Sequence, residues 1–118
     1  MAVTCKELIQ KEHWDRFQNG DIVQFMDTNN STYFGIVLRK SGNNIINLLM
    51  VGGPGDLKYG HYWFFHASAF QITKLFPVPQ ELISSLREGI ELIYPHKYLD
   101  NLTYIEILAR LREYERSI

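Results

Sequence analysis

The sequence predicts an α+β protein, in which a small five-stranded antiparallel barrel follows a short N-terminal helix and precedes two C-terminal helices. Three observations support this fold class. A capping box opens the N-terminal segment, five short runs of β-forming residues fall between residues 20 and 76, and apolar residues recur every three or four positions after Phe76. We expect the barrel to be closed, because closure removes the exposed edges of a short flat sheet.

The composition is that of an ordinary globular domain. The chain has 118 residues, of which 46% are hydrophobic and 21% are charged, so we expect one domain over residues 1–118. Its expected parts are the N-terminal helical segment 1–19, the barrel 20–76 and the helical extension 77–118. Cys5 is the only cysteine, which favours a reducing, cytoplasmic location. No run approaches the ~18 apolar residues of a membrane span, so we expect no membrane association.

The first helix is expected from about Thr4 to Trp14. Thr4 and Glu7 have the spacing of a capping box, in which the threonine hydroxyl accepts from the amide three residues on and the glutamate reaches back. Asn19 and Gly20 then end the segment, and the pattern changes to that of strands.

Five short strands should follow. They are expected at Asp21 to Met26, Tyr33 to Lys40, Asn44 to Val51, Tyr62 to His66 and Phe70 to Leu75. Glycine and asparagine between the second and third strands predict a tight hairpin, because both residues tolerate positive φ. A long glycine-bearing loop over residues 52–60 precedes the fourth strand, and residues 67–69 are expected to form a brief helical turn.

Two helices should close the chain. Pro77 and Pro79 frame the start of the first, and Pro95 ends it. Gly89 lies inside this helix and costs about 1 kcal/mol relative to alanine. A second capping box, Thr103 to Glu106, predicts the start of the final helix. We expect the helices to pack against the barrel, against each other or against another copy of the chain.

The order of these strands resembles that of the SH3-like small barrels, a superfamily that includes KOW and Tudor modules and the toxin ribonucleases of the MazF/PemK type. The resemblance covers about Gly20 to Phe76 and has Gly20-Asp21-Ile22-Val23 as its opening phrase. It implies binding of nucleic acid, peptides or partner proteins through loops and exposed strand faces, with RNA cleavage in a minority of members. Fold alone does not choose among these activities.

The sequence contains no pattern that predicts catalysis or metal binding. His61 and His66 are five positions apart on one expected strand, so their side chains should point to opposite faces and cannot share a metal. Cys5, near a helix start, is more simply a small apolar residue than a nucleophile. A ribonuclease of the toxin type, as the resemblance implies, would have Arg39 and Thr73 as its nearest matches. We expect no cofactor and no metal.

The candidate binding residues are aromatic and basic side chains of the strands and the glycine-bearing loop. Aromatic rings offer a face for stacking, and nearby cations pair with phosphate or carboxylate. Half of the strand aromatics must fill the interior, because strand side chains alternate. The candidates are Tyr33, Arg39, Lys40, Lys58, Tyr59, Tyr62, Trp63 and Lys74.

These features predict a non-enzymatic binding module that contacts a partner protein through the barrel loops or the helical tail, as an adaptor or inhibitor. The net charge of −1 and the aromatic content place a protein partner ahead of nucleic acid. The alternative is a nucleic-acid-binding protein of the KOW or Tudor type, and a MazF-like endoribonuclease comes third. The C-terminal helices can also pair with a second copy, which predicts a homodimer.

Overall fold

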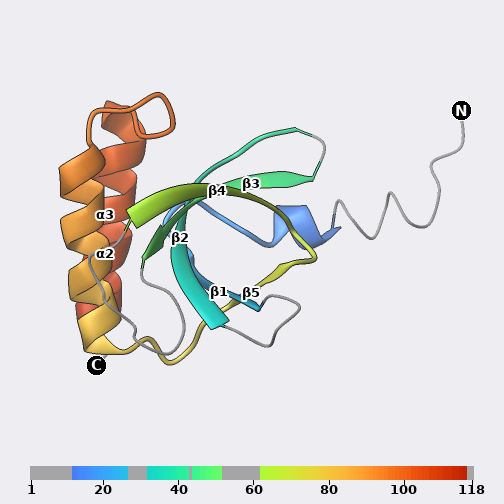
Figure 1. Ribbon diagram of the computed structural model, residues 1–118. Helices are drawn as coiled ribbons and strands as arrows, with labels where there is room; N and C mark the ends of the chain where they lie inside the picture. The colour runs from blue at the N-terminus through green and yellow to red at the C-terminus, as the bar shows by residue number, and fades with distance from the viewer. Residues whose placement is uncertain (1–11, 27–31, 43, 52–61, 117–118) are drawn as a thin grey trace, which may run out of the picture.

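The computed structural model describes residues 12–26, 32–42, 44–51 and 62–116, and within them it shows an α+β fold (Figure 1). Residues 12–15 are helical and end the short N-terminal helix. The expected start of that helix, Thr4 to Lys11, lies outside the described residues. The remaining elements are β1 (Ile22–Met26), β2 (Thr32–Lys40), β3 (Ile45–Val51), β4 (Tyr62–Ser68), β5 (Ile72–Lys74), α2 (Gln80–Ile93) and α3 (Asn101–Arg116).

The five strands form one antiparallel sheet in the order β4-β3-β2-β1-β5. Its register pairs Ile22 with Ile36 and Leu49 with Phe64. The predicted β2–β3 hairpin is confirmed: Ser41 N donates to Ile45 O at 2.9 Å, and Asn44 takes the positive φ of 67° that a tight turn demands. The register shifts between Val37 and Arg39, which bends β2.

The predicted closure of the barrel is not confirmed. β4 and β5 stand at the two ends of the sheet, and no pairing joins them within the described part of the chain. The connection between them is a tight turn in which Gln71 N donates to Ser68 O at 2.9 Å. β5 has only three residues, and all three pair with β1, so little strand is left to reach β4.

The boundaries of the last two strands differ from the prediction. Residues 67 and 68 continue β4 and form no helical turn, because β3 extends far enough to pair Ile46 with Ala67 and Ile45 with Ser68. The final strand is also shorter than the expected Phe70 to Leu75, since residues 69–71 make the turn between β4 and β5. Pairing with a neighbouring strand therefore outweighed the local helical preference of the small residues.

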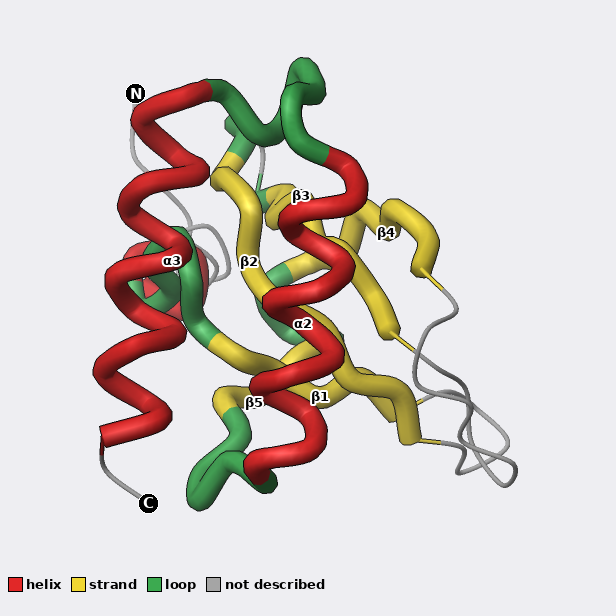
Figure 2. Tube along the Cα trace, turned by 90° about the vertical axis from the view of Figure 1, so that its left-hand side faces the viewer, coloured by secondary structure: helices red, strands yellow, loops and turns green. Residues whose placement is uncertain are grey.

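Helices α2 and α3 lie antiparallel and cover one face of the sheet (Figure 2). Their buried side chains form one hydrophobic core with those of β1, β2 and β3. The helices therefore pack against both the sheet and each other, which are two of the three arrangements expected from the sequence. Their outer surfaces expose Leu92, Leu102 and Ile105, so a homodimer through these helices stays a prediction.

The start of α3 corrects the predicted capping box. The helix begins at Asn101, and the residue before it, Asp100, accepts a hydrogen bond from Thr103 N at 2.8 Å. Asp100 therefore occupies the N-cap position, and Thr103 is already inside the helix. The physical reason is that a carboxylate placed one turn earlier satisfies the free amides at the helix start at least as well as the threonine hydroxyl would.

The other face of the sheet curves around a second hydrophobic core. This core contains Phe17 of the N-terminal segment and Ala69 of the β4–β5 turn together with alternate residues of the strands: Val23, Val37, Ile46, Leu48, Met50, Ala67 and Ile72. Trp14 attaches the N-terminal segment to the hairpin, since its Nε1 donates to Ser41 O at 2.9 Å and to Ile45 O at 3.2 Å. We call this side the concave face and the helix-covered side the convex face.

In the described ranges, no helix has the length and apolar character that crossing a bilayer demands.

Candidate functional site

A cleft lined by aromatic side chains opens on the concave face. Its volume is about 270 Å³, and it is lined by Phe25, Tyr33, Met50, Trp63 and Phe65. These residues come from β1, β2, β3 and β4, at the end of the sheet where β1 and β3 finish and β2 and β4 begin. One cleft thus draws on four strands whose residues are up to 40 positions apart in the chain.

Strand alternation and the curl of the sheet build the walls. Trp63 and Phe65 are two apart on β4, so both side chains point to the concave face. The Phe25 and Phe65 ring centroids are 5.1 Å apart, and those of Tyr33 and Trp63 are 6.0 Å apart at an interplanar angle of 90°. Such tilted and edge-on contacts are favourable arrangements for aromatic pairs, and they hold the walls in place.

The floor of the cleft depends on a glycine. Met50 pairs with Gly35 across β2 and β3, and Met50 is only 1% exposed. A Cβ atom on Gly35 would lie 2.7 Å from Met50 Sδ and 2.9 Å from Leu49 O. The absence of a side chain at residue 35 lets the thioether lie flat on β2, which makes a deformable apolar floor.

The size and lining of the cleft suit one large apolar or flat group. The four aromatic walls are about half buried, and all of the lining side chains are apolar or aromatic. Concave sites with mostly apolar linings are where proteins usually bury a ligand group. Aromatic and methionine side chains are also enriched at protein–protein interfaces.

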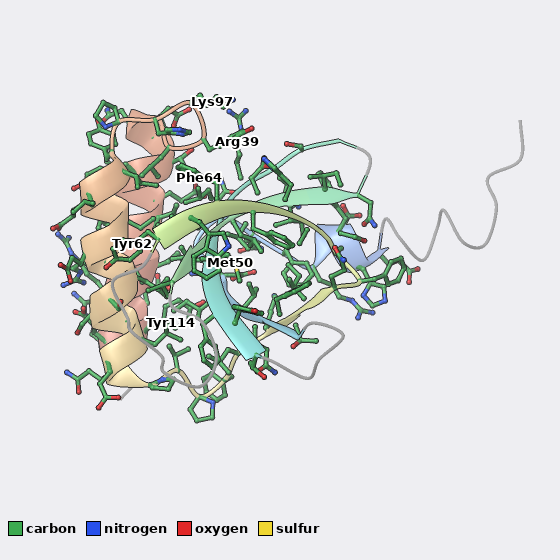
Figure 3. All side chains as sticks on the ribbon, viewed as in Figure 1. Arg39, Met50, Tyr62, Phe64, Lys97 and Tyr114 are labelled. Carbon is green, nitrogen blue, oxygen red and sulfur yellow. The ribbon has the colours of Figure 1, made fainter. Side chains whose placement is uncertain are left out.

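Of the eight predicted binding residues, the structure brings Tyr33 and Trp63 together in this cleft. Tyr62 points the other way, as expected of a neighbour of Trp63 on a strand. Its hydroxyl donates to Ser85 O at 3.0 Å, and its ring lies against Gly89 of α2, so it attaches β4 to the helices (Figure 3). Lys58 and Tyr59 lie outside the described residues.

The three remaining candidates are cations at three separate places. Lys40 Nζ lies 4.0 Å from the centroid of the Trp14 ring and donates to Trp14 O at 3.4 Å. Lys74 Nζ lies 3.5 Å from Asp21 Oδ2. Arg39 donates to Lys97 O at 3.4 Å, at the loop between α2 and α3. None of the three lines the aromatic cleft.

Three cleft residues were missed by the choice of candidates: Phe25, Met50 and Phe65. A signal for Phe65 was present, because a residue two positions from Trp63 on a strand must share its face. Phe25 lies directly opposite Tyr33 in the β1–β2 pair, so its place beside Tyr33 depends on the register of these two strands. Its contact with Phe65 depends on the curl of the sheet, since β1 and β4 are not neighbours.

A second cluster of rings lies on the convex face, between β4 and the loop that joins α2 to α3. The Phe64 ring stacks on His96 with centroids 4.4 Å apart, and the Tyr98 ring meets His66 edge-on at 5.4 Å. Lys97 Nζ lies 4.9 Å from the centroid of the Tyr98 ring. Figure 3 shows Arg39 and Lys97 close to this loop, with Phe64 beneath them. The cluster places aromatic rings beside cations.

Asn47 orients one imidazole of this cluster. Asn47 is 2% exposed, its amide nitrogen donates to Ser41 Oγ at 2.7 Å, and its Oδ1 contacts His66 Nδ1. A hydrogen bond here requires Nδ1 of His66 to carry the proton, because Oδ1 can only accept. This contact fixes the orientation of the His66 ring relative to β3.

A second hollow, of about 420 Å³, lies between the N-terminal segment and β5. Its polar lining includes His13, Arg16, Thr73 and Lys74. Thr73 therefore lies in this hollow, while Arg39 contacts the α2–α3 loop. The two residues nearest to a toxin ribonuclease pattern are thus on different parts of the surface.

In the part of the chain that the structure describes, no group of three or more His, Cys, Asp or Glu side chains is placed to hold a metal ion.

The fold and the cleft define an α+β protein whose curled antiparallel sheet carries an aromatic cleft on one face and two helices on the other. No protein-family model matches the chain, and neither a curated protein nor a solved structure is significantly similar to it.

Proposed function

We propose that this protein is a non-enzymatic binding module that contacts a partner protein and acts as an adaptor or inhibitor. The observation that carries the proposal is the aromatic cleft of Phe25, Tyr33, Trp63 and Phe65 over Met50. An apolar or aromatic side chain of the partner fills this cleft and is desolvated there, as anchor residues are at protein interfaces. The SH3-like resemblance agrees with such a role.

Charge supports a protein partner over a nucleic acid. The net charge is −1, and the cations at residues 39, 40 and 74 already contact a backbone oxygen, a tryptophan ring or a carboxylate. A nucleic-acid contact at this site would need cations around the cleft, since phosphate neutralisation supplies most of non-specific affinity. The single cysteine favours a reducing, cytoplasmic setting for the complex.

A pull-down from the native host, read by mass spectrometry, tests the proposal. The wild-type chain and a Leu102→Ala control should retain the same protein at low and high salt, and Trp63→Ala should lose it. Leu102 is 78% exposed on α3, away from the cleft, so the Leu102→Ala variant controls for nonspecific retention through exposed apolar side chains. Equal retention by Trp63→Ala would contradict the proposal.

The Trp63→Ala variant must be shown to be folded. Trp63 is half buried, so the loss in the free energy of unfolding should be about 1–3 kcal/mol, below the 3–5 kcal/mol typical of a fully buried ring. A cooperative thermal melt at a lowered Tm would show that lost binding reflects the cleft and not unfolding.

The second candidate function is binding of single-stranded nucleic acid. The observation that favours it is the cluster of aromatic rings on the convex face, between β4 and the α2–α3 loop. Phe64 is 37% exposed, and Lys97 and Arg39 lie at the same loop. Bases stack on aromatic rings while cations follow the backbone. Binding of a labelled single-stranded oligonucleotide that weakens steeply with salt, and is lost in Phe64→Ala but kept in Trp63→Ala, would favour this function over the first.

A further inference from the structure

The outer edge of β4 borders the aromatic cleft. β4 is the last strand of the sheet on its side, and within the described residues it pairs only with β3. Trp63 and Phe65, which form two walls of the cleft, belong to this strand. An extended chain added to this edge would therefore run beside the cleft.

The hydrogen bonds at the end of β4 tell which backbone groups face outward. Ala69 N donates to Asn44 O at 3.2 Å, so residue 69 turns its amide toward the β3 side of the hairpin. Backbone direction alternates along a strand, so the amides of Phe65 and Ala67 also face β3. Those of Phe64, His66 and Ser68 face the open edge.

Ser68 confirms this alternation independently. Its N–H donates to Gln71 Oε1 at 2.8 Å, and its carbonyl accepts from Gln71 N at 2.9 Å. Both outward groups of Ser68 are thus occupied by the turn that leads to β5. Among the described residues no hydrogen bond reaches the backbone of Phe64 or His66 from outside the β3–β4 pair. The turn at Ser68 limits an added strand to the Tyr62–His66 part of the edge.

We infer that the partner binds as an extended segment along this part of β4, with one large apolar side chain in the aromatic cleft. The inference rests on the proposed function and names its mode of recognition. The outward N–H and C=O groups of Phe64 and His66 pair with the partner backbone, which gives affinity, while the cleft beside Trp63 selects the anchoring side chain. Side chains two apart on the partner point to the concave face, so the segment has an alternating pattern.

A second copy of this chain fits the edge less well. If two β4 edges paired, the side chains brought to the concave face would be Trp63 and Phe65, which already form the cleft walls. No side chain would be left to fill the 270 Å³ between them. A foreign segment with its own aromatic or large aliphatic residue satisfies both the edge and the cleft.

Selection of peptides from a random display library on the immobilised wild-type chain supplies a probe. The enriched peptides should carry one large apolar residue within a run of β-forming residues. Their affinity should fall at least about tenfold, or 1.4 kcal/mol, in Trp63→Ala and stay unchanged in Leu102→Ala. Loss in neither variant, or no enrichment above a blank surface, would overturn both the inference and the proposed function.

Two substitutions at one position isolate the backbone contribution. His66→Pro removes the outward N–H and leaves the hydrogen bonds between β4 and β3 intact. An edge strand tolerates proline at a position whose N–H faces outward. His66→Ala removes the imidazole and keeps the N–H. We expect affinity for the selected peptide to fall at least about fivefold in His66→Pro, or about 1 kcal/mol for one hydrogen bond, and to stay within about twofold in His66→Ala.

Hydrogen exchange gives a readout that does not depend on these variants being equally stable. In the wild-type chain, the amides of Phe64 and His66 should exchange quickly when free and slowly when the selected peptide is bound. If the peptide needs Trp63 but protects neither amide, or if His66→Pro binds like His66→Ala, strand addition is wrong and cleft binding stands. Concentration-dependent dimers that the peptide dissociates would instead assign the edge to a second copy and overturn the inference.

Discussion

The ring centroids of Phe25 and Phe65 lie 5.1 Å apart, although β2 and β3 separate their strands in the sheet. In a flat sheet, strands three spacings apart would lie about 14 Å from each other. The sheet is therefore curled until the concave side chains of β1 and β4 touch. This contact between side chains, and not a backbone pairing, draws β1 and β4 together, and it makes one wall of the cleft.

A double-mutant cycle on Phe25→Ala and Phe65→Ala should show coupling. We expect an interaction free energy of about 0.5–1.5 kcal/mol, the usual value for a tilted aromatic pair. Chemical denaturation of the two single variants and the double variant measures it. The matched cycle of Phe25→Ala with Phe70→Ala should be additive within about 0.5 kcal/mol, because Phe70 contacts His13 in the turn beyond β4. Additivity in both cycles would contradict the cross-sheet contact.

Replacing Gly89 by alanine should destabilise the protein, although alanine is the better helix former. A Cβ atom at residue 89 would lie 2.5 Å from the Tyr62 ring, which its bond to Ser85 O holds in place. Overpacking costs about 1–3 kcal/mol, against a propensity gain of about 1 kcal/mol, so the net loss should reach about 2 kcal/mol. Ser84→Ala, on the exposed face of α2, should leave Tm unchanged or slightly raised. A rise in Tm for Gly89→Ala would show that α2 does not approach β4 so closely.

Replacing Arg110 should lower the free energy of unfolding more than replacing any exposed cation. The Asp21 carboxylate is 4% exposed, with Arg110 Nη2 at 2.6 Å and Lys74 Nζ at 3.5 Å. Arg110→Ala leaves that carboxylate with the more distant lysine and with the Gln18 backbone amide, which donates to Asp21 Oδ2 at 2.8 Å. Removing one partner of a buried pair costs about 3–5 kcal/mol, and the solvent exposure of Arg110 and the remaining Lys74 reduce this to about 2–3 kcal/mol.

Arg112→Ala is the matched control for this substitution. Arg112 is exposed on the same helix, so its loss should change the free energy of unfolding by no more than about 0.5 kcal/mol. Urea denaturation compares the two variants with the wild-type chain. Equal stability of Arg110→Ala and Arg112→Ala would mean that the Asp21–Arg110 pair does not join α3 to β1.

The cap of α3 should make stability depend on pH. The hydrogen bond from the Thr103 backbone amide, followed by that from its hydroxyl, lowers the pKa of Asp100 below its usual value. A lowered pKa in the folded chain means that the ionised carboxylate adds stability above the usual aspartate pKa, and that this stability is lost as pH falls through the folded value. Asp100→Ala should lower Tm at neutral pH.

Asp100→Asn separates the charge from the cap, because asparagine is an equally good N-cap residue. Its Tm should lie below that of the wild-type chain at neutral pH and converge with it as the pH falls below about 4, where aspartate loses its charge. Thermal melts across this pH range test the prediction. A Tm difference that stays constant from neutral to acidic pH would assign the effect to something other than the carboxylate charge.

The sequence predicted the strand positions well where alternation is strong. β1, β2 and β3 begin and end within one residue of the expected positions, since their apolar residues leave one register in which a face is buried. It failed at residues 67–69, where small residues have weak local preferences and the register with β3 decided the outcome. It failed again at Thr103, because Asp100 is an equally good cap and the loop from α2 placed it first.

The sequence alone determined the fold class and which side chains of each strand share a face. Trp63 and Tyr62 had to point to opposite faces of β4, whatever the tertiary structure. Only the tertiary structure decided which face the helices cover, and so which of these two aromatics is occupied by α2 and which lines the cleft. It also decided that Phe25 meets Phe65. Contacts between non-neighbouring strands depend on the curvature of the whole sheet, a property that no local run of residues carries.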